Sequence, residues 1–171
     1  MLKQSRNFLP AVILALALTA PAAAQPGRPS TLPQVADLFV GAWLGHGMTP
    51  SSEKFTSELN FSWTLDKNFI EVRNKIDDGK ETRQFALTIY GWQPVLGKVV
   101  FWSFDRDGTI HEGLATLEGT TLTHEWRSFS KGGEIRDWRS TLDRFEENRL
   151  RFTLMEKSGQ VIYAIEYKKQ K

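Results

Sequence analysis

The chain has 171 residues, with 22 Lys and Arg against 20 Asp and Glu, a net charge of +2 and no cysteine. This length suits a single domain. The lack of cysteine excludes disulfides, thiolate metal sites and a thiol nucleophile. The small, evenly spread charge gives no basic stripe of the kind that nucleic-acid-binding proteins carry, so we expect no nucleic-acid partner.

Residues 1–24 have the features of a cleaved secretory signal peptide. Lys3 and Arg6 precede an apolar core at Ala11–Ala20, and Ala22–Ala24 supplies a small-residue cleavage site. The alternative is an uncleaved anchor, but the core is flanked by prolines and is shorter than the roughly 20 residues that a spanning helix needs. We therefore expect cleavage after Ala24, no stable membrane insertion afterwards, and a periplasmic or secreted location, since a cysteine-free exported domain is typical of the bacterial periplasm.

The mature chain would contain 147 residues with 20 basic and 20 acidic side chains, so it is formally neutral. Electrostatic capture by nucleic acid or an anionic membrane is then not expected. Residues 25–32 form a flexible lead-in rich in Pro and Gly, and residues 33–171 form the domain. Within it, the pattern PQVADLFV predicts a short helix at 33–40 that begins at a proline and ends at Gly41.

After this helix, runs of about nine residues alternate between apolar and polar side chains, which predicts strands. The clearest alternation is in Glu58–Leu65. Short turns rich in Gly and Asp separate the runs, and such turns permit only hairpins, so the sheet is an antiparallel meander. The ten predicted strands are 41–48, 56–65, 68–76, 82–92, 98–105, 109–117, 120–129, 133–143, 148–156 and 160–168.

The expected fold is all-β, a closed up-and-down barrel of about ten strands with one short N-terminal helix. An open meander would expose two unpaired edges. An even strand number lets the first and last strands run antiparallel and pair, which removes both edges. A two-sheet sandwich is the alternative, but it usually has longer Greek-key connections.

A short helix followed by Gly41-Ala42-Trp43 and a meander resembles the Gly-x-Trp opening of lipocalins and the wider calycin group. With this opening and the segments Phe39–Gly45 and Trp63–Phe69, the mature chain as a whole is most similar to the uncharacterised lipocalin-like families of secreted bacterial proteins. The resemblance covers most of residues 33–168 with motifs of low specificity. The chain departs from lipocalins in having no disulfide and no C-terminal helix.

The resemblance implies that Trp43 is structural, closing the barrel floor against a late arginine, for which Arg149 and Arg151 are the candidates. Haem-binding calycin relatives use a late-chain histidine, whereas the last histidine here is His124. We therefore expect no cofactor. The spacings of His46, His111 and His124 match no compact ligand pattern, so we also expect no metal.

Polar residues that share a face with the aromatic ones are candidates for a cavity lining, because that face of a closed barrel points inward. The sixth strand is open between two parities, one carrying Glu112 and the other Gly113 and Ala115. The eighth is open between a face with Arg139 and a face with Trp138. The predicted ligand-binding residues are Phe61, Trp63, Trp102, Phe104, Glu112, His124, Trp126 and Arg139.

Pairing each hairpin about its turn sets Trp102 beside Glu112, Glu112 beside His124, and His124 beside Arg139. If this row faces inward, it places an acid, an imidazole and a guanidinium on an aromatic wall. Buried charges must be compensated, so the row would anchor a ligand or serve catalysis. The alternatives are that His124 is an ordinary hydrogen-bonded strand residue and that Glu112 and Arg139 face solvent.

Three functions follow from this pattern. The first is a periplasmic binding or carrier protein for a small hydrophobic or amphipathic molecule. The second is an isomerase, cyclase or hydrolase acting on a lipophilic substrate, with His124 or Glu112 as general base and Arg139 stabilising negative charge. The third is a barrel without a ligand that uses an exposed Tyr90 and Trp92 as an interaction patch.

Overall fold

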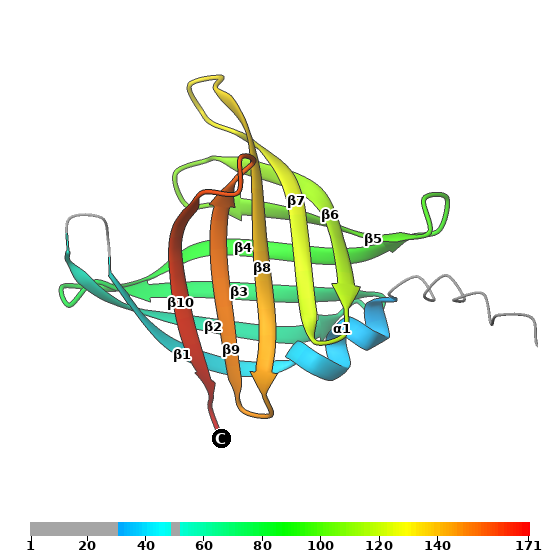
Figure 1. Cartoon of the computed structure of the whole chain (residues 1–171), viewed down its shortest axis with the longest axis horizontal. Helices are drawn as coiled ribbons and strands as arrows, with labels where there is room; N and C mark the ends of the chain where they lie inside the picture. The colour runs from blue at the N-terminus through cyan, green and yellow to red at the C-terminus, as the bar shows by residue number, and fades with distance from the viewer. Residues whose placement is uncertain (1–30, 49–51) are drawn as a thin grey trace, which may run out of the picture.

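The computed structural model describes residues 31–48 and 52–171, which form a closed antiparallel barrel with one helix at its end (Figure 1). The proposed signal peptide at 1–24 lies outside the described residues. The elements are α1 (Leu32–Phe39), β1 (Gly41–Met48), β2 (Lys54–Thr64), β3 (Phe69–Asp77), β4 (Thr82–Gln93), β5 (Lys98–Asp105), β6 (Ile110–Glu118), β7 (Thr121–Phe129), β8 (Ile135–Glu146), β9 (Arg149–Glu156) and β10 (Val161–Lys169).

The barrel closes between its first and last strands. Each strand pairs with its neighbours in the chain, and β1 pairs antiparallel with β10 through Trp43 opposite Lys169. This confirms the ten-strand barrel, and the predicted strand ends agree with the structure to within a few residues. A sandwich does not form, because short hairpins keep sequential strands adjacent and closure removes both edges.

Helix α1 closes one end of the barrel. At its start, the Gln34 side chain accepts a hydrogen bond from the Thr31 N–H at 2.7 Å, which satisfies a backbone donor that the helix leaves free. Leu32, Val35 and Phe39 on one face are buried in the core. The helix thus acts as a plug, and no helix in the described residues has the length and apolar character that a membrane crossing requires.

Trp43 completes this closed end of the barrel. Its ring is fully buried, and its Nε1–H donates to the backbone carbonyl of Phe39 at 2.8 Å, which fixes the turn from helix to strand. The Lys169 ammonium lies 5.2 Å from the ring centroid, within cation–π range. Lys169 therefore occupies the position that the resemblance assigned to an arginine.

The two arginines expected against Trp43 lie elsewhere. Arg149 and Arg151 both pair with Glu166 on exposed side chains and stack on Phe145. The prediction was wrong because it rested on chain position, whereas the β1–β10 register decides which cation lies over the indole. Another arginine does hold the plug, since Arg144 Nη1 donates to the Leu38 carbonyl at 3.0 Å.

Candidate functional site

The barrel encloses a cavity of about 640 Å³. All ten strands contribute to its wall, and it extends to the hairpin ends opposite α1, which we call the mouth. Its size falls in the range of small-molecule sites. Its apolar lining residues are Met48, Phe55, Leu59, Phe61, Val72, Ile76, Phe85, Ala86, Phe101, Trp126, Trp138, Leu142, Phe152, Leu154 and Ile165. Its polar ones are Ser57, Asn74, Thr88, Tyr90, Ser103, Asp105, Thr109, His111, His124, Ser128, Ser130, Glu134, Arg136, Ser140, Tyr163 and Tyr167.

His124 is the centre of one polar group in this wall. Its Nε2 lies 2.9 Å from the Tyr90 hydroxyl and its Nδ1 lies 3.2 Å from Ser140 Oγ, while the Phe101 ring packs edge-on against it. Burial lowers the pKa of His124 from 6.5 to about 4. The imidazole is therefore neutral at physiological pH, and its two nitrogens are already occupied by hydroxyl groups.

A second polar group on the inner wall also consists of neutral side chains. The Tyr167 hydroxyl donates to Ser57 Oγ at 3.0 Å, and Ser57 donates to Asn74 Oδ1 at 3.1 Å. Thr88 Oγ1 donates to Ser103 Oγ at 2.8 Å on the adjoining strands. Burial raises the pKa of Tyr167, which keeps its hydroxyl protonated. The middle of the cavity is thus polar without being charged.

The third polar group lies toward the mouth and includes a charged partner. His111 Nε2 lies 2.9 Å from Asp105 Oδ2, and both side chains are about four-fifths buried. The Trp126 ring packs edge-on against the His111 ring, with centroids 6.4 Å apart. Among the described residues, His111 Nδ1 and Trp126 Nε1 are the buried side-chain polar atoms without a hydrogen-bond partner.

The predicted site residues divide between the two faces of the barrel. Phe61, His124 and Trp126 line the cavity. Trp63 is half-buried against the core and is not among the residues that line the cavity. The inward parity assigned to the seventh strand is therefore confirmed, whereas the placement of Trp63 in the lining is wrong.

Trp102 and Phe104 point outward, contrary to the prediction, and are 40% and 44% exposed. The inward residues of β5 are Val99, Phe101 and Ser103. Both faces of this strand carry large apolar side chains, so its alternation does not identify the inner one. The packing of Phe101 against Tyr90 and His124 fixes the parity instead.

Glu112 and Arg139 also lie on the outer face, so the predicted row does not form. The pairing of Trp102 with Glu112 is confirmed. Glu112 pairs with Arg127 rather than His124, and His124 pairs with Ser140 rather than Arg139. A slip of one residue moves a side chain to the opposite face, and the turns after β6 and β7 are centred differently from the prediction.

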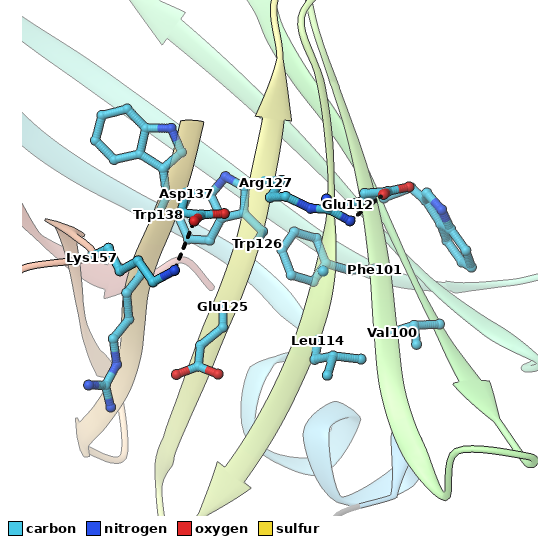
Figure 2. Close-up of a pocket in the computed structure, with 13 residues that line it drawn as sticks. Val100, Phe101, Glu112, Leu114, Glu125, Trp126, Arg127, Asp137, Trp138 and Lys157 are labelled. Carbon is cyan, nitrogen blue, oxygen red and sulfur yellow. Dashed lines mark hydrogen bonds and ion pairs between the residues drawn. The ribbon is translucent and has the colours of Figure 1, made fainter. Parts of the chain in front are cut away.

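The outer face of β5 to β8 instead carries a band of charges over a shallow groove of about 530 Å³. Figure 2 shows the pair of Arg127 with Glu112, at 3.8 Å, and the pair of Lys157 with Asp137, at 2.9 Å. Arg139 lies opposite Glu125 in the same band. These pairs are exposed, so they contribute little to stability. Their charges alternate in sign, so the band offers no net charge to a partner.

Sequence reasoning missed most of the inner wall, including Tyr90, His111 and Asp105. The third alternative required an exposed Tyr90 beside Trp92, but Tyr90 is buried against His124, so this patch does not form. His111 and Asp105 were not assigned to the site. The four-residue turn between β5 and β6 and the small inward residues Gly113 and Ala115 were the available signals, because small residues inside a barrel leave room for rings on the next strand.

Gly113 illustrates this point. It lies opposite Trp126, and a Cβ at this position would lie 2.5 Å from Trp126 Cβ and clash with the Glu125 carbonyl. The missing side chain allows the indole to fold over β6 toward His111.

Within residues 31–48 and 52–171, no group of three or more His, Cys, Asp or Glu could hold a metal ion.

Comparisons with known proteins identify the fold. No protein-family model and no curated protein matches the chain. The crystal structure of Rv2717c from M. tuberculosis is similar with a TM-score of 0.56 at 14% identity, covering 81% of this chain and 96% of that one. A de novo fluorescence-activating β-barrel has a TM-score of 0.38 at 15% identity, covering 80% and 97%. A redesigned β-barrel has a TM-score of 0.40 at 12% identity, covering 83% and 100%. The chain thus shares the fold of the Rv2717c structure, and that fold is here a closed ten-strand β-barrel.

Proposed function

We propose that this protein is exported to the periplasm and binds a small, largely apolar molecule inside its barrel, as a distant relative of the lipocalin-like secreted proteins. The cavity of about 640 Å³ carries the proposal. Small barrels are commonly filled by their own side chains, whereas this one keeps space for a ligand. Its lining of aromatic and aliphatic side chains with a few polar groups is typical of ligand sites.

The hydrogen-bonded hydroxyls of the wall support binding rather than a collapsed core. Ser57, Thr88 and Ser140 are small inward side chains at mid-barrel, where larger residues would fill the space. Their hydroxyls are paired with neighbours, so the wall holds its shape without a ligand. Such a preformed pocket loses little conformational entropy on binding.

Native mass spectrometry of the purified protein, followed by solvent extraction, tests this proposal. We expect a co-purified small molecule that dissociates when the protein is denatured. Ala86→Phe adds a ring to the cavity wall and should abolish retention. The matched control Leu87→Phe, on the outer side of the same strand, should retain the molecule. Equal retention by both variants would contradict an interior site.

Export is tested separately. The N-terminal sequence of the periplasmic protein should begin at Gln25, because the small residues Ala22–Ala24 form the cleavage site. Replacing Ala22 and Ala24 with bulky residues should leave an uncleaved precursor. A cytoplasmic protein that begins at Met1 would contradict the proposed location.

Catalysis on a lipophilic substrate is a second candidate, but with residues other than those predicted. Glu112 and Arg139 lie outside the barrel, whereas His111 and Asp105 form a His–carboxylate pair in the cavity wall. Such a pair can orient an imidazole as a general base. Hydrolysis of a short-chain nitrophenyl ester above the buffer rate, lost in His111→Gln and kept in His46→Gln, would favour this function. Turnover that is equal in both variants would reject it.

A further inference from the structure

The charges in the cavity wall limit the chemistry of the ligand. The ionised groups that line it are Asp105, Glu134 and Arg136, and no lysine does so among the described residues. Glu134 accepts from Arg136 Nε at 2.8 Å, and Asp105 lies against His111. The single cation is therefore already paired. A ligand carboxylate would lose its hydration without gaining a free positive partner, which is costly.

The pairing of His111 with Asp105 also determines what its other nitrogen can do. A carboxylate only accepts hydrogen bonds, so Nε2 must carry the proton that the contact requires. In the neutral ring, Nδ1 is then an acceptor. This atom is buried and has no partner among the described residues.

Trp126 supplies the complementary group. The indole Nε1–H is a donor only, and here it too is buried without a partner. The two rings are in contact, with centroids 6.4 Å apart, and both belong to the cavity wall. The wall near the mouth therefore contains a buried acceptor and a buried donor, both without partners, on two rings that are in contact.

A hydroxyl group can satisfy both atoms at once, because its oxygen accepts from Trp126 while its proton is donated to His111. We propose that the ligand is an uncharged molecule with an apolar body and a hydroxyl group, and that His111 Nδ1 and Trp126 Nε1 bind this hydroxyl. This inference rests on the proposed function. Since the rings pack together, the hydroxyl enters by a rotamer change of one of them, a common adjustment on binding.

Calorimetric titration with four probes that share one ring system tests the proposal. Naphthalene has no polar group, methoxynaphthalene only accepts, naphthol both accepts and donates, and naphthoate is charged. At about pH 8, above the ordinary range for histidine, we expect naphthol to bind about tenfold more tightly than naphthalene. Methoxynaphthalene should be intermediate, and naphthoate should be the weakest.

Two tryptophan variants form a matched pair for the same titration. Trp126→Phe removes the unused indole N–H and should reduce the preference for naphthol over naphthalene to about threefold or less. Trp102→Phe changes a partly exposed tryptophan on the outer wall, outside the cavity, so it should leave the preference unchanged. The preference is a ratio on one protein, so a general loss of stability does not imitate the effect.

The outcomes separate the two proposals. If no probe binds, both the cavity function and this inference are overturned. If naphthalene and naphthol bind equally, or if naphthoate binds most tightly, the cavity function stands and the hydroxyl site is overturned. Should Trp126→Phe fail to fold, the wild-type order of the four probes still decides the question.

Discussion

Trp43 and Trp126, at opposite ends of the barrel, differ in whether the indole N–H has a hydrogen-bond partner. At the closed end, Trp43 donates to the Phe39 carbonyl at 2.8 Å and has Lys169 over its ring. Toward the mouth, Trp126 Nε1 is buried without a partner beside His111. An unmade hydrogen bond costs stability, so a fold retains one mainly where it serves another purpose. The comparison supports the proposal that the α1 end stabilises the fold and the mouth end binds the ligand.

Trp43→Ala should have the largest effect on this comparison. It removes a fully buried ring, and we expect the free energy of unfolding to fall by about 4 kcal/mol in urea titrations. Trp102→Ala, on the outer wall, should cost about 1 kcal/mol or less because the ring is already partly solvated. Similar losses for the two variants would contradict the role of Trp43 as the structural floor.

His124 should make the barrel less stable in mild acid. Its pKa is about 4 in the folded state against 6.5 unfolded, so the unfolded chain binds a proton first as the pH falls. Stability is full above about pH 6.5 and declines by up to about 3 kcal/mol toward pH 4. Urea titrations across this range should show a weaker pH dependence for His124→Gln than for the wild type.

A control distinguishes this effect from general acid destabilisation. His46 is an exposed histidine of β1, so His46→Gln should follow the wild-type pH dependence. If His124→Gln follows it equally well, the buried imidazole does not cause the acid sensitivity.

Gly113→Ala tests whether the missing side chain makes room for Trp126. The new methyl group would clash with the Glu125 carbonyl and press on Trp126 Cβ, so we expect a loss of about 2 kcal/mol in the free energy of unfolding. Gly132→Ala, in the β7–β8 turn, has no close neighbour within 3.4 Å and should change stability little. If Gly113→Ala leaves the free energy of unfolding unchanged, the wall around Trp126 can accommodate the extra methyl group.

Lys169→Met should give the smallest loss of stability and tests whether the cation over the Trp43 ring stabilises the closed end. It removes the cation over the Trp43 ring but keeps an apolar stem, so we expect a loss of about 0.5–1 kcal/mol. Lys168→Met, on the neighbouring exposed position, should be neutral within error. Equal effects would assign no specific role to the cation–π contact.

The sequence predicted the fold better than the site. Short turns and two-residue alternation determine hairpins and strand ends, and the closed barrel followed from them. The site depended on which face of each strand points inward. For β7 the contrast between Leu122, His124 and Trp126 and their polar or charged neighbours was sufficient. By contrast, β5 has large apolar residues on both faces, so its parity was undetermined.

Register was the second source of error. The predicted contacts of His124 required the turns after β6 and β7 to be centred at particular residues. The two-residue turn at Gly119 and Thr120 moves the partner of Glu112 three positions, from His124 to Arg127. The longer turn before Ile135 moves the partner of Arg139 one position, from His124 to Glu125. A shift of this size is energetically subtle locally, yet it moved Glu112 and Arg139 to the outer wall.

The sequence by itself determined the antiparallel meander and the helix that precedes it, because these depend on local patterns of turns and apolar residues. Only the tertiary structure decided the wall of the cavity. Side-chain packing across strands, such as Phe101 against Tyr90 and Trp126 over Gly113, selects the inward faces. That selection brings His111, Asp105 and Trp126 together, although no motif in the sequence connects them.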